Sequence, residues 1–109
     1  MAYDEHLAQR VRKLLAKQPG VTERKMFGGS AFMVQGNMCC GVHKTDLIVR
    51  VGPQQYEQAL AEPGARPMDI TGRPLKGFVF ADASACRNEK TLARWVKRGL
   101  GFATALPAK

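Results

Sequence analysis

Apolar residues recur at helical spacing near both ends of the chain and form strand-like runs between them. Near the N-terminus the apolar positions follow the i, i+4, i+7, i+8 spacing of an amphipathic helix: Leu7, Val11, Leu14 and Leu15. We predict a helix over residues 4–18. Asp4 and Glu5 would lie in its first turn, where acidic side chains complement the helix dipole. Pro19-Gly20 ends the helix.

A second amphipathic helix is predicted after Asn88. Asn88 is a favourable N-cap residue, and Glu89 follows it in the first turn. The apolar positions share one broad helical face: Leu92, Trp95, Val96, Gly99, Phe102 and Ala103. Because Trp95 lies in the middle of that face, we expect its ring to pack in the core.

Residues typical of β-strands concentrate in the middle of the chain. Three strands are predicted over residues 31–34, 38–43 and 47–51. Gly36-Asn37 between the first two is the signal of a two-residue hairpin. Residues 30–51 therefore read as an antiparallel meander.

The segment that leads into this meander is polar and glycine-rich. Residues 21–25 are predicted to be an exposed link, because Glu23, Arg24 and Lys25 are charged. Gly28-Gly29 interrupts a strand pattern, which indicates a bulge or a bend where another backbone approaches closely.

The second half of the chain predicts shorter elements. After Gly52-Pro53 we predict a short helix over residues 54–61, then strands over residues 67–70 and 78–81. The predicted order is α-β-β-β-α-β-β-α. We therefore expect one α+β domain over residues 1–109, with a five-stranded, mainly antiparallel sheet and helices packed on it.

Composition narrows the class of protein. The chain has 109 residues, 45% hydrophobic and 24% charged, as in ordinary globular proteins. Its first fifteen residues are amphipathic and include acids, unlike a secretory signal, and no apolar run approaches the ~20 residues of a membrane span. We therefore predict a cytoplasmic protein whose three cysteines are reduced thiols.

The net charge of +8 favours polyanionic partners such as nucleic acid or an acidic protein. Lys and Arg side chains gather on the polar faces of both predicted helices, with a smaller basic group in the loop before the last strand. A charged face is also what any solvated surface helix presents, so that alternative stays open. The candidate binding residues are Arg87, Lys90, Arg94, Lys97, Arg98, Arg10, Lys13, Lys17, Arg73 and Lys76.

Cys39, Cys40 and His43 are the candidates for a metal or redox site. Adjacent strand residues point to opposite faces, so the two thiols cannot share one ion without a bulge. The spacing matches no zinc signature, and the thiols of these residues and of Cys86 are better explained as small apolar groups filling the core. We expect no metal and no cofactor.

The sequence contains no other recognisable catalytic motif. The glycines lack the pattern of a P-loop or a dinucleotide fingerprint, and there is no Gly-x-Ser-x-Gly. His6 and His43 have no nucleophile or carboxylate in a recognisable arrangement. We predict a non-enzymatic protein without catalytic residues.

The chain resembles the N-terminal domain of the TfoX/Sxy family. Six short segments carry the resemblance, in the family's order: Met26-Phe27-Gly28-Gly29, Phe32-Met33-Val34-Gln35-Gly36-Asn37-Met38, Leu47-Ile48-Val49-Arg50-Val51-Gly52, Gly72-Arg73-Pro74-Leu75-Lys76-Gly77, Trp95-Val96 and Leu106-Pro107-Ala108-Lys109. The residues expected to have structural roles in these motifs are Met26, Phe27, Gly28, Gly29, Gly36, Gly72, Gly77 and Trp95.

The resemblance implies a secretion-chaperone-like α+β fold and a bacterial protein. The name-giving members regulate natural competence together with the transcription machinery, and they carry a further C-terminal domain of helix-hairpin-helix type. The sequence up to Lys109 does not include that domain, so we expect promoter activity to transfer poorly. The family supplies no catalytic residues.

Three hypotheses follow. The first is a regulatory or adaptor domain that contacts a transcription-machinery protein or nucleic acid through its basic helix faces. The second is a homodimeric, chaperone-like interaction module. The third is a small-molecule or metal binder that uses Cys39, Cys40 or His43.

Overall fold

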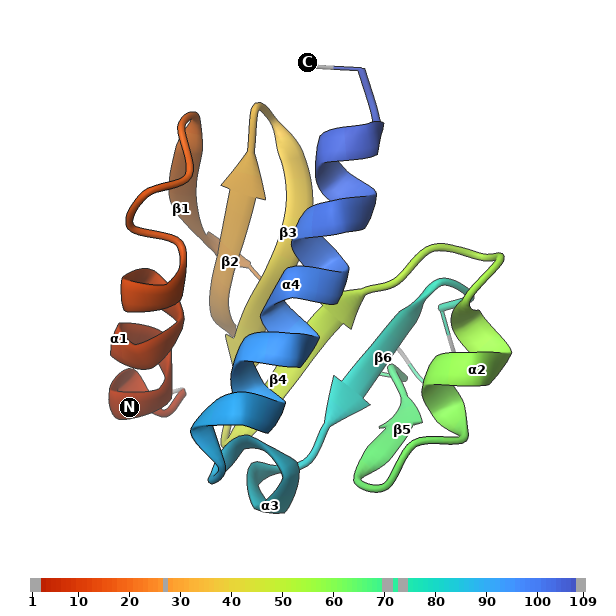
Figure 1. Cartoon of the computed structure of the whole chain (residues 1–109). Helices are drawn as coiled ribbons and strands as arrows, with labels where there is room; N and C mark the ends of the chain where they lie inside the picture. Colours follow the sequence, from red (N-terminus) through yellow and green to blue (C-terminus); the bar gives the residue numbers. More distant parts are fainter. Residues whose placement is uncertain (1–2, 27, 70–71, 73–74, 108–109) are drawn as a thin grey trace.

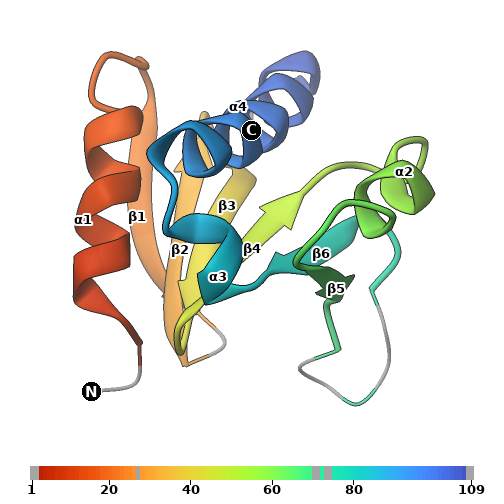
Figure 2. The same cartoon turned by 60° about the horizontal axis from the view of Figure 1, so that its bottom comes forward.

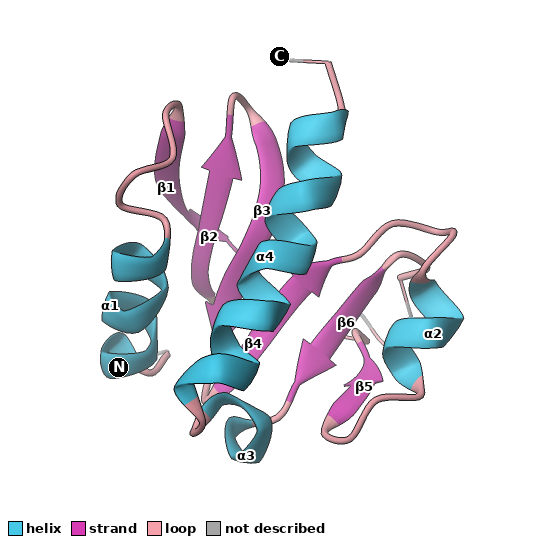
Figure 3. Cartoon of the chain, viewed as in Figure 1, coloured by secondary structure: helices cyan, strands magenta, loops and turns pink. Residues whose placement is uncertain are grey.

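A computed structural model describes residues 3–26, 28–69, 72 and 75–107 of the protein. Figure 1 shows the chain and Figure 3 its secondary structure. The elements, in chain order, are α1 (Glu5–Leu14), β1 (Val21–Met26), β2 (Gly29–Val34), β3 (Asn37–His43), β4 (Asp46–Arg50), α2 (Tyr56–Leu60), β5 (Ala65–Pro67), β6 (Phe78–Ala81), α3 (Ala83–Cys86) and α4 (Glu89–Ala105).

The strands form one antiparallel sheet in the order β1-β2-β3-β4-β6-β5. The α+β class and the central antiparallel meander are as predicted. The described part of the chain contains six strands rather than five, and a short extra helix, α3, precedes α4.

The larger helices cover one face of the sheet. Figures 1 and 2 show α1 over the β1 side and α4 crossing β3 and β4, while α2 lies beside β5 and β6. The main core fills the space between this helix layer and the sheet, with Trp95 and Phe32 among its largest fully buried side chains. A second buried cluster on the other face of the sheet is built from Ala31, Met33, Met38, Ile48, Met68 and Phe80.

Helix α1 is shorter than predicted. Asp4 is its N-cap, not part of its first turn, and the Asp4 carboxylate accepts hydrogen bonds from the backbone N–H groups of His6 and Leu7 at 3.0 and 3.2 Å. The helix ends at Leu14, four residues before the predicted end. Beyond Leu14 the chain continues as tighter turns, in which the Ala16 N–H donates to the Lys13 carbonyl at 3.3 Å and the Gln18 N–H to the Leu15 carbonyl at 3.0 Å.

Strand β1 was missed because its side chains are charged. The predicted link is the edge strand of the sheet and pairs with β2 from Val21–Val34 to Met26–Gly29. An edge strand exposes much of its surface, and charged residues there are common protection against aggregation. Apolar alternation therefore could not reveal it.

The glycine pair forms a hairpin corner rather than an interruption within one strand. Gly28 has φ +72° in the turn between β1 and β2, and Gly29 begins β2. A Cβ at Gly29 would lie 1.9 Å from the carbonyl oxygen of Val42 on β3. The predicted close backbone approach is therefore correct, but the bend is a turn.

The next hairpin turns one residue earlier than predicted. Its central residues are Gln35 and Gly36, both with positive φ (50° and 86°), as in a type I′ turn. Asn37 instead begins β3, and its Nδ2 donates to the Pro107 carbonyl at 2.9 Å. That bond ties the hairpin to the end of the chain.

Boundaries also differ in the second half. Strand β4 covers 46–50 instead of 47–51, and α2 covers 56–60 instead of 54–61. Strand β5 spans 65–67 rather than 67–70, so Pro67 ends it. Proline has no N–H to donate, which suits the edge position of β5. Ile70 lies outside the described residues.

The predictions for β6 over residues 78–81 and for α4 are confirmed. The side chain of Asn88 caps α4 by accepting from the backbone N–H groups of Lys90 and Thr91 at 2.8 and 3.3 Å. None of the helices in the described ranges combines the length and the apolar character needed to cross a bilayer.

Candidate anion-binding groove beside the C-terminal helix

The position of α4 depends on a glycine contact with the sheet. A Cβ at Gly99 would lie 2.3 Å from the carbonyl oxygen of Cys39, so the helix backbone rests directly on β3. Trp95, one turn earlier, is 1% exposed on the same side. This close packing directs the next residues around the helix towards solvent and towards α2.

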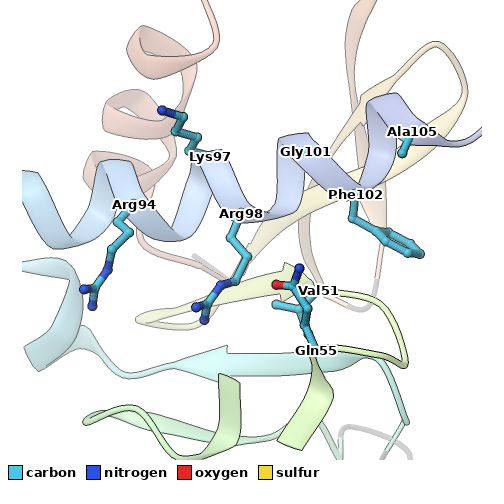
Figure 4. Close-up of a pocket in the computed structure, with 8 residues that line it drawn as sticks. All are labelled: Val51, Gln55, Arg94, Lys97, Arg98, Gly101, Phe102 and Ala105. Carbon is cyan, nitrogen blue, oxygen red and sulfur yellow. The ribbon is translucent and has the colours of Figure 1, made fainter. Parts of the chain in front are cut away.

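A groove of about 560 Å³ runs along that outer side of α4. It is lined by Val51, Gln55, Arg94, Lys97, Arg98, Gly101, Phe102 and Ala105. Figure 4 shows Arg94 and Arg98 extending from α4 to the side on which Gln55 lies, whereas the ammonium of Lys97 points away from the two guanidinium groups. One end of the groove is therefore cationic and the other, around Val51 and Phe102, is apolar.

The two arginines share a single carboxylate. Arg94 Nη2 lies 2.9 Å from Glu62 Oε1, and Arg98 Nη2 lies 2.5 Å from Glu62 Oε2. The Arg98 guanidinium also stacks on Trp95, 5.0 Å from the ring centroid. Among the described residues, Arg98 Nη1 and Trp95 Nε1 are buried donors without an acceptor. The two guanidinium groups of the groove thus have one carboxylate between them.

A third guanidinium adds to the positive charge near the apolar end. Arg50 lies 5.2 Å from the Phe102 ring centroid and 5.5 Å from that of Phe78. A Cβ at Gly52 would lie 2.4 Å from the Phe102 ring, so the glycine leaves room for that ring. Phe102 is therefore held in place on the floor of the groove.

At two other arginines in the described structure, carboxylates outnumber guanidinium groups. Arg12 binds both Glu5 and Glu23, each at 2.7 Å, and these hydrogen bonds lower the pKa of each carboxyl. Arg66 binds Asp46 at 2.7 Å and Asp82 at 2.5 Å, and its own pKa is raised chiefly by the hydrogen bond to Asp82. At these sites one arginine meets two carboxylates; in the groove two arginines meet one.

The structure distributes the predicted basic residues over several places. Arg10 reaches from α1 to α4, with Nη2 2.8 Å from Glu89 Oε1 and 3.4 Å from the Arg87 carbonyl. Four lysines of the same helix layer are exposed and form no ion pair within the described part of the chain: Lys13, Lys17, Lys90 and Lys97.

The smaller basic group is not joined to that layer. Lys76 is exposed in the β5–β6 connection, at the sheet edge opposite β1 and α1. Arg73 lies outside the described residues. The Arg10–Glu89 contact joins α1 to the first turn of α4.

The cysteine pair lies at a β-bulge, the condition under which both thiols can face one side of the sheet, and both fill the core as expected. The β2–β3 register passes from Met33–Met38 to Phe32–Cys40, leaving Cys39 without an opposite residue. This bulge places both Cys39 and Cys40 in the core under the helices, fully buried. The Cys39 side chain and burial together raise the pKa of the Cys40 thiol well above its usual range. The raised pKa keeps the Cys40 thiol in its protonated, weakly nucleophilic form.

His43 is not a partner for these thiols. Its ring stacks on Phe80 at 5.8 Å between centroids, and Phe80 belongs to the cluster on the other face of the sheet. Across the described residues no three His, Cys, Asp or Glu side chains are grouped as metal ligands.

A second hollow of about 520 Å³ lies where α1 meets the start of α4, and its lining includes His6, Arg10, Cys86 and Glu89. Its thiol and its paired arginine are not activated for catalysis. Burial raises the pKa of the Cys86 thiol to about 11, and Arg10 is already paired with Glu89. A thiol with that pKa is protonated near neutral pH, so this hollow lacks an activated nucleophile.

The family model of the TfoX N-terminal domain matches residues 13–103. The chain belongs to this family. No curated protein and no solved structure matches it.

Within this TfoX N-terminal domain, motif glycines Gly36, Gly72 and Gly77 all have positive φ, 86°, 87° and 95°. Their structural role thus follows from backbone geometry that other residues adopt only with strain. Phe27 of the first motif lies outside the described residues.

Sequence reasoning identified Arg94, Lys97 and Arg98 but not the rest of the groove. Gln55 falls within the helix predicted over residues 54–61, Arg50 within the strand predicted over 47–51, and Phe102 on the apolar face of the last predicted helix. Glu62 follows the predicted helix and belongs to no predicted element. No local spacing relates Glu62 to α4, so no sequence signal could have paired it with Arg94 and Arg98.

Proposed function

We propose that this TfoX N-terminal domain is a non-enzymatic adaptor that binds a negatively charged partner through the helix layer of α1 and α4. The family membership supports a regulatory domain, and the net charge of +8 supports a polyanionic partner. The partner is a protein of the transcription machinery, a nucleic acid, or both.

One observation carries the proposal. Four lysines of α1, of the turn that follows it and of α4 remain exposed without an ion-pair partner among the described residues, although arginines nearby are paired: Lys13, Lys17, Lys90 and Lys97. Unpaired cations are the groups that a phosphate backbone or an acidic protein neutralises on binding, with release of counterions.

The test is binding of mixed-sequence DNA and RNA over a range of salt concentrations. We expect affinity to fall steeply as salt rises, and Lys13→Ala combined with Lys90→Ala to weaken binding and flatten the salt dependence by about two phosphate contacts. Affinity capture from lysate with and without nuclease then separates protein partners from those bridged by nucleic acid. No shift at low salt together with no nuclease-resistant partner would reject the adaptor function.

A homodimer is the second candidate, and the unpaired outer edge of β1 within the described sheet favours it. Two copies of β1 related by a two-fold axis would extend the sheet. Centring that axis on Glu23 would oppose two carboxylates, which is unfavourable. Centring it on Arg24 would oppose two guanidinium groups but would also place Glu23 opposite Lys25 twice, so this is the register that a dimer would adopt. Light scattering on the purified protein decides: a strict monomer at all concentrations excludes it.

A further inference from the structure

We propose that the groove along α4 is the docking site for an acidic peptide segment of a partner protein, one in which acidic and apolar side chains alternate. This inference rests on the adaptor function proposed above and names the chemistry of its partner.

The dimensions of the groove suit a short extended peptide. Its lining on α4 runs from Arg94 to Ala105, which at about 1.5 Å per residue spans roughly 16 Å. An extended chain rises about 3.3 Å per residue, so about five residues fit along it. The volume of about 560 Å³ falls in the range usual for ligand sites.

The chemistry of the groove is divided in the same way as that of such a peptide. Arg94 and Arg98 offer guanidinium forks to carboxylates at one end, with the Gln55 amide beside them (Figure 4). Val51 and Phe102 offer an apolar floor at the other end. An acidic side chain next to an apolar one would satisfy both parts at once.

Glu62 shows which anion these arginines accept. It arrives from the loop after α2 and places one carboxylate oxygen on each guanidinium, at 2.9 and 2.5 Å. An incoming carboxylate can share or displace this internal one at Arg94, because the Arg94 side chain is 64% exposed. Glu62 therefore weakens binding of the peptide and tunes its affinity.

Nucleic acid fits the groove less well. Binding of single strands relies on exposed aromatic rings for base stacking. Here the Trp95 ring is buried, and Phe102 is half-buried against Gly52 and Arg50. Phosphates would also leave the apolar floor without a partner. The exposed lysines outside the groove are the better place for a phosphate backbone.

The experiment measures binding of two fluorescein-labelled peptides of about nine residues, one alternating glutamate with leucine and one alternating glutamate with serine, by fluorescence anisotropy near 0.15 M salt. We expect the glutamate–leucine peptide to bind more tightly to the wild-type domain, since both peptides carry the same charge and only the first fills the apolar floor.

Four variants locate the binding. Arg94→Ala should weaken it about fivefold by removing one charge-assisted hydrogen bond. Gly101→Leu should weaken it about tenfold by filling the groove, because a Cβ at Gly101 meets nothing within 4 Å and the helix should stay folded. Glu62→Gln should tighten it about threefold. Arg24→Ala, the matched control, removes the same charge from the exposed edge strand β1, outside the groove, and should leave affinity within about twofold. Thermal unfolding of each variant confirms that it is folded.

The outcomes separate this inference from the adaptor function. Equal losses in Arg94→Ala and Arg24→Ala, or wild-type affinity in Gly101→Leu, would overturn the groove as the site. If mixed-sequence single-stranded DNA binds and loses affinity in Gly101→Leu, the groove holds nucleic acid and the inference is wrong. DNA binding that depends on Lys13 and Lys90, with no peptide binding, would retain the adaptor function and reject the peptide site.

Discussion

Arginine–carboxylate ion pairs occur both in the groove beside α4 and at the corner between α1 and β1. The ratio of arginines to carboxylates is reversed between the two sites. At the corner, Arg12 is shared by Glu5 and Glu23, and Ser30 Oγ also donates to Glu23 at 2.5 Å. In the groove, Arg94 and Arg98 share Glu62. The corner joins a helix to an edge strand with its cation fully used, whereas the groove keeps cationic capacity for an external anion.

The difference shows why counting ion pairs says little about function. Exposed pairs contribute about 0–1 kcal/mol each, so neither site dominates the stability of the fold. What distinguishes the two is which charge is left over. Beside α1 two carboxylates hold one arginine, so that cation is not available to an external anion. Beside the open groove two arginines share one carboxylate, so an external anion can still bind there.

The largest expected effect comes from removing the contact that places α4 beside the groove. Gly99→Ala puts a Cβ 2.3 Å from the Cys39 carbonyl oxygen, and the rigid strand cannot yield as a flexible side chain would. We expect a loss of about 3 kcal/mol in the free energy of unfolding, measured by urea denaturation. A loss below 0.5 kcal/mol would show that α4 can shift on the sheet.

Gly101→Ala is the matched control on the same helix. Its Cβ meets nothing within 4 Å, so the substitution should instead stabilise the protein by about 0.5–1 kcal/mol through higher helix propensity. A destabilised Gly101→Ala would mean that the side of α4 along the groove is packed rather than open.

Arg12→Gln tests the acid-rich corner. We expect a loss of about 1 kcal/mol near pH 7, because two carboxylates lose their shared cation. The hydrogen bonds from Arg12 hold the pKa of both Glu5 and Glu23 below the ordinary 4.5. Stability from a lowered folded pKa is present above the unfolded pKa and is lost as pH falls through the folded pKa.

The difference between wild type and Arg12→Gln should therefore be constant above about pH 5 and shrink as the pH falls below about 4.5. Urea denaturation at a series of pH values measures it. A difference that grows under acid would contradict the assigned role of these carboxylates.

Glu62→Gln has the smallest expected effect on stability, about 0.5 kcal/mol, because it removes one carboxylate from an already cation-rich site. The change in Tm of this variant on addition of inorganic phosphate tests the groove more directly. Phosphate that occupies the freed guanidinium groups should raise the Tm of this variant more than that of Glu23→Gln, in which a carboxylate is removed from the corner. Equal Tm shifts in the two variants would remove the contrast between the sites.

Much of the fold was predictable because its determinants are local. The stripes of α1 and α4, the Asn88 cap, the meander and the last strand all follow from side-chain periodicity and turn residues. Errors occurred where a non-local contact decided the structure. Strand β1 is held by β2 and by Arg12 rather than by apolar alternation, and the bulge at Cys39 depends on the pairing of β3 with β2.

The sequence by itself determined the α+β class, the family and which helix residues are basic, because periodicity, charge and motif order are properties of the chain. Only the tertiary structure decided which cations are already neutralised. Arg10 and Glu89 are far apart in sequence, as are Arg94 and Glu62, and each pair meets only when the helix layer folds over the sheet. The same folding leaves the α4 groove with two arginines and one carboxylate, and no local pattern encodes that balance.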